Sequence, residues 1–185
     1  MKTTLIFPNS VRCLILLTLF TACTASPAPA AENRAPNPSF EMGEKSVVSG
    51  WEGNHSPKTF TWSEEVAYSG KRSVCISNLP ADTSADWLTS EFIPVTPGTT
   101  YTLSAYVKGD FDREAYILVF PIDADGKYME GSSADISFNN TDWTYAEVDF
   151  TAPPNAVAVE LDLGTNNASD TAATGMICYD EVSFR

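Results

Sequence analysis

Two large aromatic side chains are out of phase with the apolar residues around them. Tyr106 alternates with the apolar residues of 101–107, and Trp87 is opposite in phase to Leu88 and Phe92. In strands with one buried face, both rings should therefore stand on the outer face of a sheet. The chemistry expected of such exposed rings is stacking against a ligand that has an apolar face.

Polar side chains close to these rings could complete a site. Asp86 and Lys108 are near the two rings in the sequence, and Glu147 is out of phase with its apolar neighbours. Glu160 is out of phase in the same way, although plain solvation also explains each of these carboxylates. Rings paired with polar groups suit sugars, which present C–H faces and polar edges.

Residues arranged for catalysis are not evident. Paired acids on a β-sandwich could cleave glycosidic bonds, but no acid stands out from the others. The one histidine, His55, lies in a polar loop and in no nucleophile motif. A small carbohydrate-active enzyme is therefore a weak alternative, and it would need two carboxylates facing each other across a cleft.

The elements that must position these residues are β-strands. Residues 101–108 and 156–163 alternate with period two. The second segment should bury Val157, Val159 and its two leucines and leave Ala158, Glu160 and Asp162 outside. Further strands are expected near 60–66, 73–78, 86–93, 115–122, 143–150 and 175–184. Many short strands separated by Pro, Gly and Asn turns predict an all-β fold, a two-sheet antiparallel β-sandwich.

The N-terminus has the pattern of an export signal. Two basic residues frame the start, and residues 13–20 are an apolar run too short for a permanent membrane span. Small residues before Cys23 resemble a bacterial lipobox, although cleavage at 28–30 by the ordinary signal peptidase is the alternative. We expect a signal peptide over 1–22, lipidation at Cys23, a Pro/Ala-rich tether over 23–36 and one domain over 37–185.

The charge of the chain is strongly negative. The whole chain carries −13, and removing residues 1–22 removes Lys2 and Arg12 but no acid, which leaves −15. Such a charge excludes nucleic acid and anionic lipid as partners, so that any membrane contact should come through the lipid anchor alone.

Short segments along the chain occur in a particular order. They are Asn37–Glu41, Gly50-Trp51, Tyr68–Lys71, Val95–Tyr101, Trp143, Phe150–Pro153 and Tyr179–Phe184. In this order they resemble the carbohydrate-binding modules of families 4, 9 and 22, over roughly residues 36–185. The resemblance implies a β-jelly roll related to the galactose-binding-like fold, and it implies glycan recognition.

The resemblance also assigns roles to single residues. In these families a structural calcium lies between the first and last strands, which on this chain implies Glu41, Asp180, and the carbonyls of Ser39 and of a residue near Lys71. The alternative is that Asp180 orders a strand edge and Glu41 is solvated. The segment 123–127 looks like part of a calcium loop, but a hairpin turn explains it better.

The resemblance also assigns two of the tryptophans to packing. In the resembled families Trp51 and Trp143 are core or edge packing. The other aromatic candidates for ligand contact are Trp62, Tyr116, Tyr128 and Tyr145.

The resemblance places the strands of Cys75 and Cys178 side by side. Cys13 should leave with the signal and Cys23 should be acylated, so these two cysteines remain in an oxidising compartment. We expect a disulfide between them, with two buried free thiols as the alternative.

Together these observations favour a non-catalytic glycan- or polysaccharide-binding domain. It would be exported and lipid-anchored at the bacterial envelope, and it could serve a separately encoded glycan-degrading enzyme or transporter. The main alternative is a structural or adhesive surface domain of the same fold without a sugar site.

Overall fold

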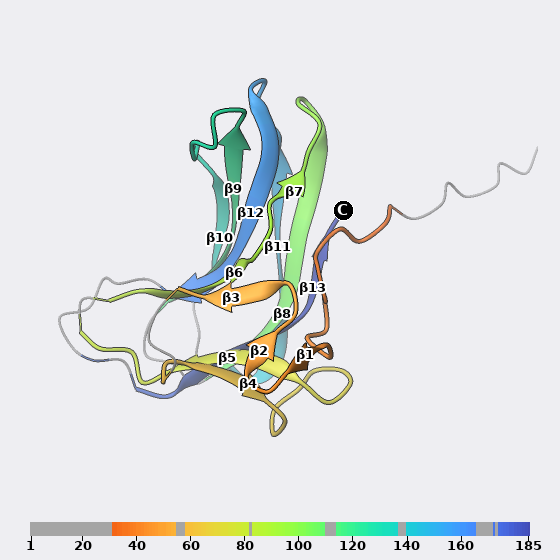
Figure 1. The fold of residues 1–185 in the computed structure, drawn as a ribbon. Helices are drawn as coiled ribbons and strands as arrows, with labels where there is room; N and C mark the ends of the chain where they lie inside the picture. Colours follow the sequence, from red (N-terminus) through yellow and green to blue (C-terminus); the bar gives the residue numbers. More distant parts are fainter. Residues whose placement is uncertain are drawn as a thin grey trace, which may run out of the picture. The chain divides into compact units, whose positions relative to one another are not determined.

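Alternating apolar side chains assemble residues 31–185 into an antiparallel β-sandwich (Figure 1). The computed structural model describes residues 31–54, 58–81, 83–109, 114–136, 140–165, 172 and 174–185. The expected signal peptide, Cys23 and His55 lie outside these residues. The predicted all-β, two-sheet sandwich is confirmed, and the described part of the chain contains no apolar helix of membrane-spanning length.

Thirteen strands are present in the described residues. They are β1 (Gly43–Glu44), β2 (Val47–Val48), β3 (Trp51–Gly53), β4 (Phe60–Ser63), β5 (Ser73–Ser77), β6 (Ala85–Thr89), β7 (Ile93–Pro94), β8 (Thr100–Gly109), β9 (Ala115–Asp123), β10 (Ser132–Ile136), β11 (Asn140–Thr151), β12 (Ala156–Thr165) and β13 (Met176–Phe184). One sheet of the sandwich has the order β10-β9-β12-β6-β3, with β7 also paired to β12, and the other has the order β11-β8-β13-β5-β4. The short strands β1 and β2 pair with each other in a separate two-stranded sheet.

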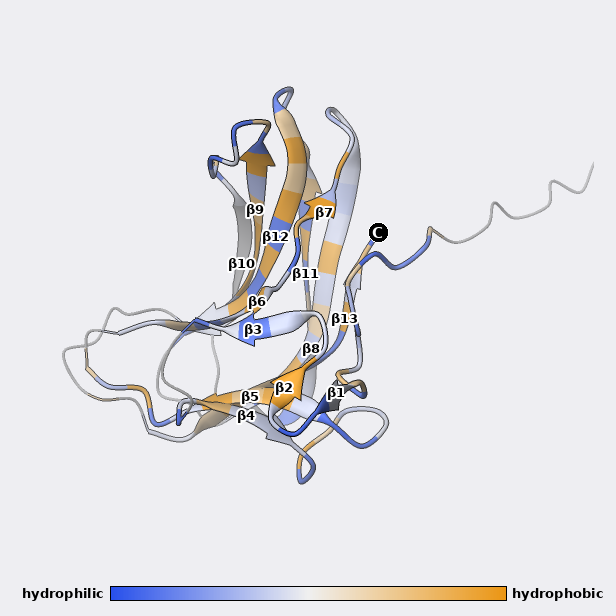
Figure 2. Cartoon of the chain, viewed as in Figure 1, coloured by the Kyte–Doolittle hydropathy of each residue, from blue (hydrophilic) through white to orange (hydrophobic). Residues whose placement is uncertain are grey.

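The core lies between the two sheets. Alternate residues of the long strands supply it, and the banding along β9 and β12 in Figure 2 shows the same alternation. The largest side chains that are fully buried are Tyr179, Phe40, Phe150, Phe184, Ile76, Leu79, Leu103, Ile117, Ile122, Leu161 and Leu163. Because each strand gives one face to this core, its other face is free to carry polar groups.

The predicted inner face of β12 is wrong at one position. Val159 and Leu161 are buried as expected, but Val157 is 47% exposed. The register between β12 and β9 shifts between Ala156 and Ala158, and Ala156 is buried instead. A bulge of this kind changes which residue faces the core, and period-two alternation cannot reveal it.

The domain begins earlier than expected. The Asn33 amide donates to the Val182 carbonyl (2.9 Å), and its oxygen accepts the N–H of Phe184 (2.9 Å). The N–H of Arg34 donates to the Phe184 carbonyl (2.8 Å), and Ala35 is buried. Residues 33–36, which were assigned to the tether, therefore lie along β13 as part of the sandwich.

A disulfide joins β5 to β13. Cys75 and Cys178 are register partners on these neighbouring strands, with Cα atoms 4.0 Å apart and both residues buried. The bond links positions 103 residues apart. It therefore ties the middle of the chain to its last strand.

We predict that the disulfide contributes measurably to the stability of the folded domain. Residues 31–185 contain no other cysteine, so reduction should act on this bond alone. For a loop of about 100 residues the chain-entropy model gives about 4–5 kcal/mol, and a reductant should lower the melting temperature of residues 31–185. The double variant Cys75→Ala with Cys178→Ala should melt at the lower temperature with or without reductant. Two free thiols in the denatured, unreduced protein would contradict the bond.

Candidate functional site

The predicted platform of Trp87 and Tyr106 does not exist. Trp87 is 4% exposed, its Nε1 donates to the Cys75 carbonyl (3.3 Å), and its ring meets Phe60 edge to face at 5.0 Å. The alternation with Phe92 does not predict the face of Trp87, because the two residues do not belong to the same strand. The strand β6 ends at Thr89, and Phe92 is 49% exposed. Trp87 is therefore a core residue.

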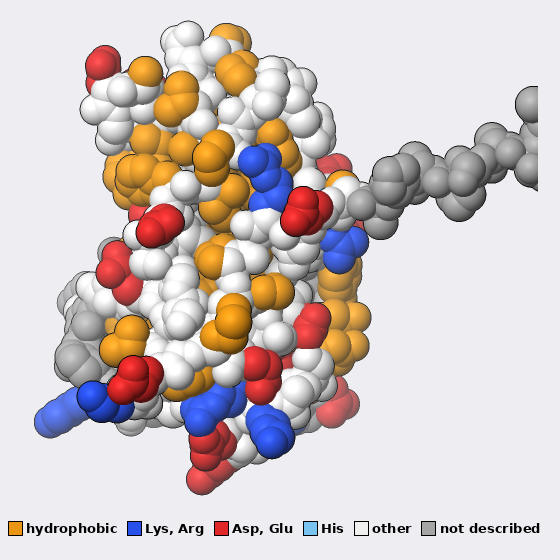
Figure 3. Space-filling view, turned by 45° about the vertical axis from the view of Figure 1, so that its right-hand side comes forward, with side chains coloured by type: hydrophobic (Ala, Val, Ile, Leu, Met, Phe, Trp, Pro, Cys, Tyr) orange, Lys and Arg blue, Asp and Glu red, His pale blue; other side chains and the backbone are white. Residues whose placement is uncertain are grey.

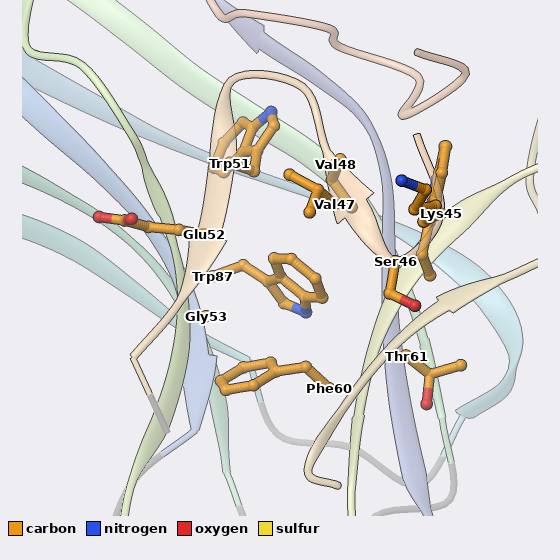
Figure 4. Close-up of a pocket in the computed structure, with 11 residues that line it drawn as sticks. Lys45, Ser46, Val47, Val48, Trp51, Glu52, Gly53, Phe60, Thr61 and Trp87 are labelled. Atoms are coloured by element: carbon orange, nitrogen blue, oxygen red, sulfur yellow. The ribbon is translucent and has the colours of Figure 1, made fainter. Parts of the chain in front are cut away.

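A cavity of about 500 Å³ lies beside Trp87, at the edge of the sandwich where β3 and β4 come near each other (Figure 4). Figure 4 shows Trp51, Trp87 and Phe60 lining it, while Glu52 points away. Trp51 is packed as expected, with its Nε1 donating to the Pro36 carbonyl (2.8 Å). Lys45, Ser46 and Thr61 also line the cavity, so its walls are partly polar.

Three of the predicted contact residues, Tyr106, Lys108 and Glu147, lie on the outer face of the β8–β11 sheet. Tyr106 pairs in register with Tyr145, and the Tyr145 hydroxyl donates to Glu147 (2.9 Å). Tyr68 stacks on Tyr106 at 3.6 Å, which covers one side of that ring. Lys108 is two residues from Tyr106 on the same strand, and it is half-buried. We call this group the tyrosine cluster.

Trp143 belongs beside the tyrosine cluster. It is half-buried and meets Tyr68 edge to face at 5.9 Å, as a packing residue would.

Asp86, by contrast, lies on the outer face of the other sheet. Strand pairing sets three rows of outward positions there: Tyr116, Gly164 and Asp86; Leu118, Asp162, Leu88 and Glu52; and Phe120 with Glu160. Four acidic residues thus lie on β3, β6 and β12, with aromatic residues of β9 next to them. We call the surface formed by these rows the acidic face.

In the first row, Tyr116 reaches across the central strand. Its hydroxyl donates to Asp86, which also accepts a hydrogen bond from the Asn54 side chain. A Cβ at Gly164 would collide with the Asp86 carboxylate and crowd the Tyr116 ring. Burial raises the pKa of Asp86, and both hydrogen bonds oppose that shift. The glycine therefore makes room for this contact.

At the third row, Glu160 lies next to three aromatic residues, Tyr128, Phe120 and Phe92, which we call the aromatic corner. The Tyr128 hydroxyl donates to both Glu160 oxygens (3.1 and 3.0 Å). The Tyr128 ring meets Phe120 and Phe92 edge to face, at 5.8 and 6.3 Å. Tyr128 is 48% exposed and burial raises its pKa to about 12. A large apolar surface next to a carboxylate is therefore open to a ligand.

Asp162 lies between these two rows, and one of its two carboxylate oxygens has no hydrogen-bond partner. The residue is 4% exposed, and the unpartnered oxygen is Oδ1. Its neighbours in the row on either side are Leu118 and Leu88, which cannot donate. Burial, then the charges of Glu160 and Asp86, raise the pKa of Asp162 to about 8. A buried polar atom without a partner costs about 1–3 kcal/mol, so an external donor would be stabilising here.

Part of this site could be found in the sequence. The alternation correctly placed Glu160 and Asp162 outside on β12, and Tyr116 and Tyr128 were among the aromatic candidates. Their convergence with Asp86 depends on β6 and β9 flanking β12, which a single sequence does not specify.

The two carboxylates expected to hold calcium, Glu41 and Asp180, accept backbone N–H groups from the segment 68–72. Glu41 Oε1 accepts from Lys71 (2.7 Å) and Arg72 (2.9 Å), and fully buried Asp180 Oδ2 accepts from residues 68 and 69 (2.7 and 3.0 Å). Lys71 thus contributes its N–H to this contact. These oxygens face N–H hydrogens, an arrangement that does not suit a cation at the same atoms.

The remaining observations do not supply further ligands for a calcium ion. Ser39 lies in the turn before Glu41, and no group of three or more His, Cys, Asp or Glu residues in the described ranges could hold a metal. Calcium stays an untested prediction. The segment 123–127 forms a turn in which the Asp123 carboxylate accepts the N–H groups of Asp125 and Lys127, as expected of a hairpin.

Comparisons with known proteins identify the family. Residues 33–170 match the family model CBM_4_9, described as a carbohydrate binding domain. No curated protein matches the chain.

Solved structures share the sandwich. A family 16 carbohydrate-binding module is 23% identical with a TM-score of 0.58, covering 83% of this chain and 99% of the module. The CBM22-1 xylan-binding domain of Paenibacillus barcinonensis Xyn10C is 17% identical with a TM-score of 0.55, covering 80% and 90%. Tailspike protein 4 of bacteriophage CBA120 is 18% identical with a TM-score of 0.64, covering 82% of this chain but 21% of the tailspike.

At these identities the structures show a shared fold, while the family match covers most of the chain. The chain therefore belongs to the carbohydrate binding domain family CBM_4_9.

Proposed function

We propose that this domain binds a glycan on the acidic face. The observation that carries the proposal is the buried, unpartnered Oδ1 of Asp162, with Glu160 and Asp86 in the adjoining rows. Sugar hydroxyls can donate to such an oxygen, and also to the lone pairs of the tyrosine hydroxyl oxygens nearby. The exposed Tyr128 and Phe92 rings offer an apolar surface to the C–H face of a pyranose.

The arrangement of the acids supports binding without catalysis. Glycosidases place two carboxyl groups on opposite sides of the scissile bond. Here Glu160 and Asp162 are alternate residues of one strand, and Asp86 is on the next strand, so all three stand on the same side of one sheet. Asp86 and Glu160 also each accept a tyrosine hydroxyl. This geometry suits hydrogen bonding along one face of a sugar chain.

Structures with the same fold have been solved with oligosaccharides. One is a family 61 module in complex with β-1,4-galactotriose, and another is the CBM22-1–GH10 part of Clostridium thermocellum xylanase 10B with xylohexaose. The second joins such a module to an enzyme. By analogy, we propose that the present domain holds a polysaccharide near a separately encoded glycan-degrading enzyme or transporter.

Two tyrosines of matched exposure test the location of the site. Tyr128 on the acidic face is 48% exposed, and Tyr145 in the tyrosine cluster is 51% exposed. For a glycan found by array screening, Tyr128→Ala should weaken binding several-fold to about tenfold, since a ring contact adds about 0.5–1.5 kcal/mol beyond its area. Calorimetric titration should show Tyr145→Ala binding like the wild type.

The opposite ranking of these two variants would move the site to the tyrosine cluster. If a broad array of glycans gives no binding at all, the structural or adhesive alternative takes the place of this proposal.

We also propose export and anchoring through Cys23. The apolar run 13–20, the small residues before Cys23 and the Pro/Ala-rich segment after it support this assignment. Diacylglyceryl modification with further acylation supplies two or more chains, enough for stable membrane attachment.

Fractionation of cells that express the full chain tests the anchor. Cys23→Ala should move the protein out of the membrane fraction, whereas Cys13→Ala, which changes a cysteine within the expected signal, should leave the mature protein in it. An unchanged distribution of Cys23→Ala, or a mature N-terminus at Ala31, would contradict lipidation.

A further inference from the structure

We infer that the acidic face is built for a glycan that carries a free amino group, a cationic amino sugar. This inference rests on the proposed function, because it names the class of ligand for the same face. It starts from the contrast between Asp162 and the two carboxylates beside it. Asp86 and Glu160 each have a tyrosine hydroxyl as a donor, and Asp162 Oδ1 has none.

The charges around Asp162 favour a cation over a neutral hydroxyl. The outward positions of the three rows include four acids and no Lys or Arg. The ion pairs that the structure describes, Lys45 with Glu44 and Arg72 with Glu64, involve other parts of the chain. A hydroxyl would satisfy one oxygen, whereas an ammonium group would also relieve the repulsion among the acids.

The protonation behaviour of the face agrees with this assignment. Burial raises the pKa of Glu160, and the charges of Glu52 and Asp86 add to the shift. The same kind of repulsion acts on Asp162. Burial is the largest cause of both shifts, and the neighbouring negative charges add to it. A bound ammonium group would oppose both effects through a charge-assisted hydrogen bond.

The surroundings favour a sugar as the carrier of the amine. The aromatic corner of Phe92, Phe120 and Tyr128 begins at Glu160, two residues from Asp162 on β12. A pyranose could rest on these rings while its amine reaches the carboxylates. A carboxylate or sulfate on the glycan would meet the acids instead, so uronic acids and sulfated sugars should be rejected.

An acidic protein attracts cations in general, and this attraction must be distinguished from recognition of an amine on the acidic face. The chain has 24 acidic and 11 basic residues. On the side of the molecule in Figure 3, basic side chains gather mainly at the lower end while acidic ones are more widely spread. A polycation would therefore be drawn to many surfaces, and the test needs a control that removes one charge from another face.

The experiment compares three hexasaccharides with one backbone. The β-1,4-linked oligomers of glucosamine, N-acetylglucosamine and glucose are titrated into the purified protein over a series of pH values, because the amine must be charged while Asp162, whose pKa is raised to about 8, must lose its proton. We expect the glucosamine oligomer to bind at least about tenfold more tightly than the other two, because hydrogen bonds to charged groups are worth about 1.5–3 kcal/mol. Free lysine, an amine without pyranose rings, should bind much more weakly.

Two charge variants then locate the preference. Asp162→Asn keeps the size of the side chain and should remove most of the preference for the amine. Glu147→Gln also removes one acid, but from the exposed side of the tyrosine cluster, and it should leave the preference unchanged. Glu160→Gln, which should reduce the preference, serves if Asp162→Asn fails to fold, as checked by its melting curve.

Several outcomes would overturn the inference. Equal or tighter binding of the acetylated or glucose oligomer would refute the amino-sugar assignment while the proposed function stands. Equal losses in Asp162→Asn and Glu147→Gln would show general attraction, and lysine binding as tight as the glucosamine oligomer would refute the glycan. If these oligomers and a broad array of other glycans all fail to bind, the proposed function itself fails.

Discussion

Packing two sheets against each other commits one face of every long strand to the core. The inward residues of β8, β9, β12 and β13 fill the space between the sheets, and the disulfide between Cys75 and Cys178 fixes β5 beside β13. The outward residues are thereby released from packing and can carry groups that would be costly in the core. The acidic face and the tyrosine cluster are the two results, one on each sheet.

The two outer faces differ in how their polar groups are satisfied. In the tyrosine cluster, rings cover one another and the Tyr145 hydroxyl bonds Glu147. On the acidic face, Gly164 leaves room for Tyr116 to reach Asp86, and the buried Oδ1 of Asp162 is still left without a donor. A fold tolerates such a deficit where the rest of the structure offsets it, and such sites are often functional. This difference is why we place the glycan on the acidic face.

Alternation in the sequence predicted the fold and part of the site. It placed Glu160 and Asp162 on the outer face of β12, because long strands with regular period two have a single buried face. It failed at Trp87, since β6 is short and Phe92 lies beyond its end. It could not bring Asp86 beside β12, because strand order is set by contacts between distant segments. The sequence therefore indicated which residues face outward more reliably than which of them meet.

Chemical-shift mapping of backbone amides during titration with a bound glycan tests the central claim most directly, because it reports both sheets in one experiment. The account predicts that the largest shifts fall on β6, β9 and β12, around Asp86, Tyr116 and Asp162, with little change on β8 and β11. Largest shifts on β8 and β11, or around the cavity beside Trp87, would contradict it.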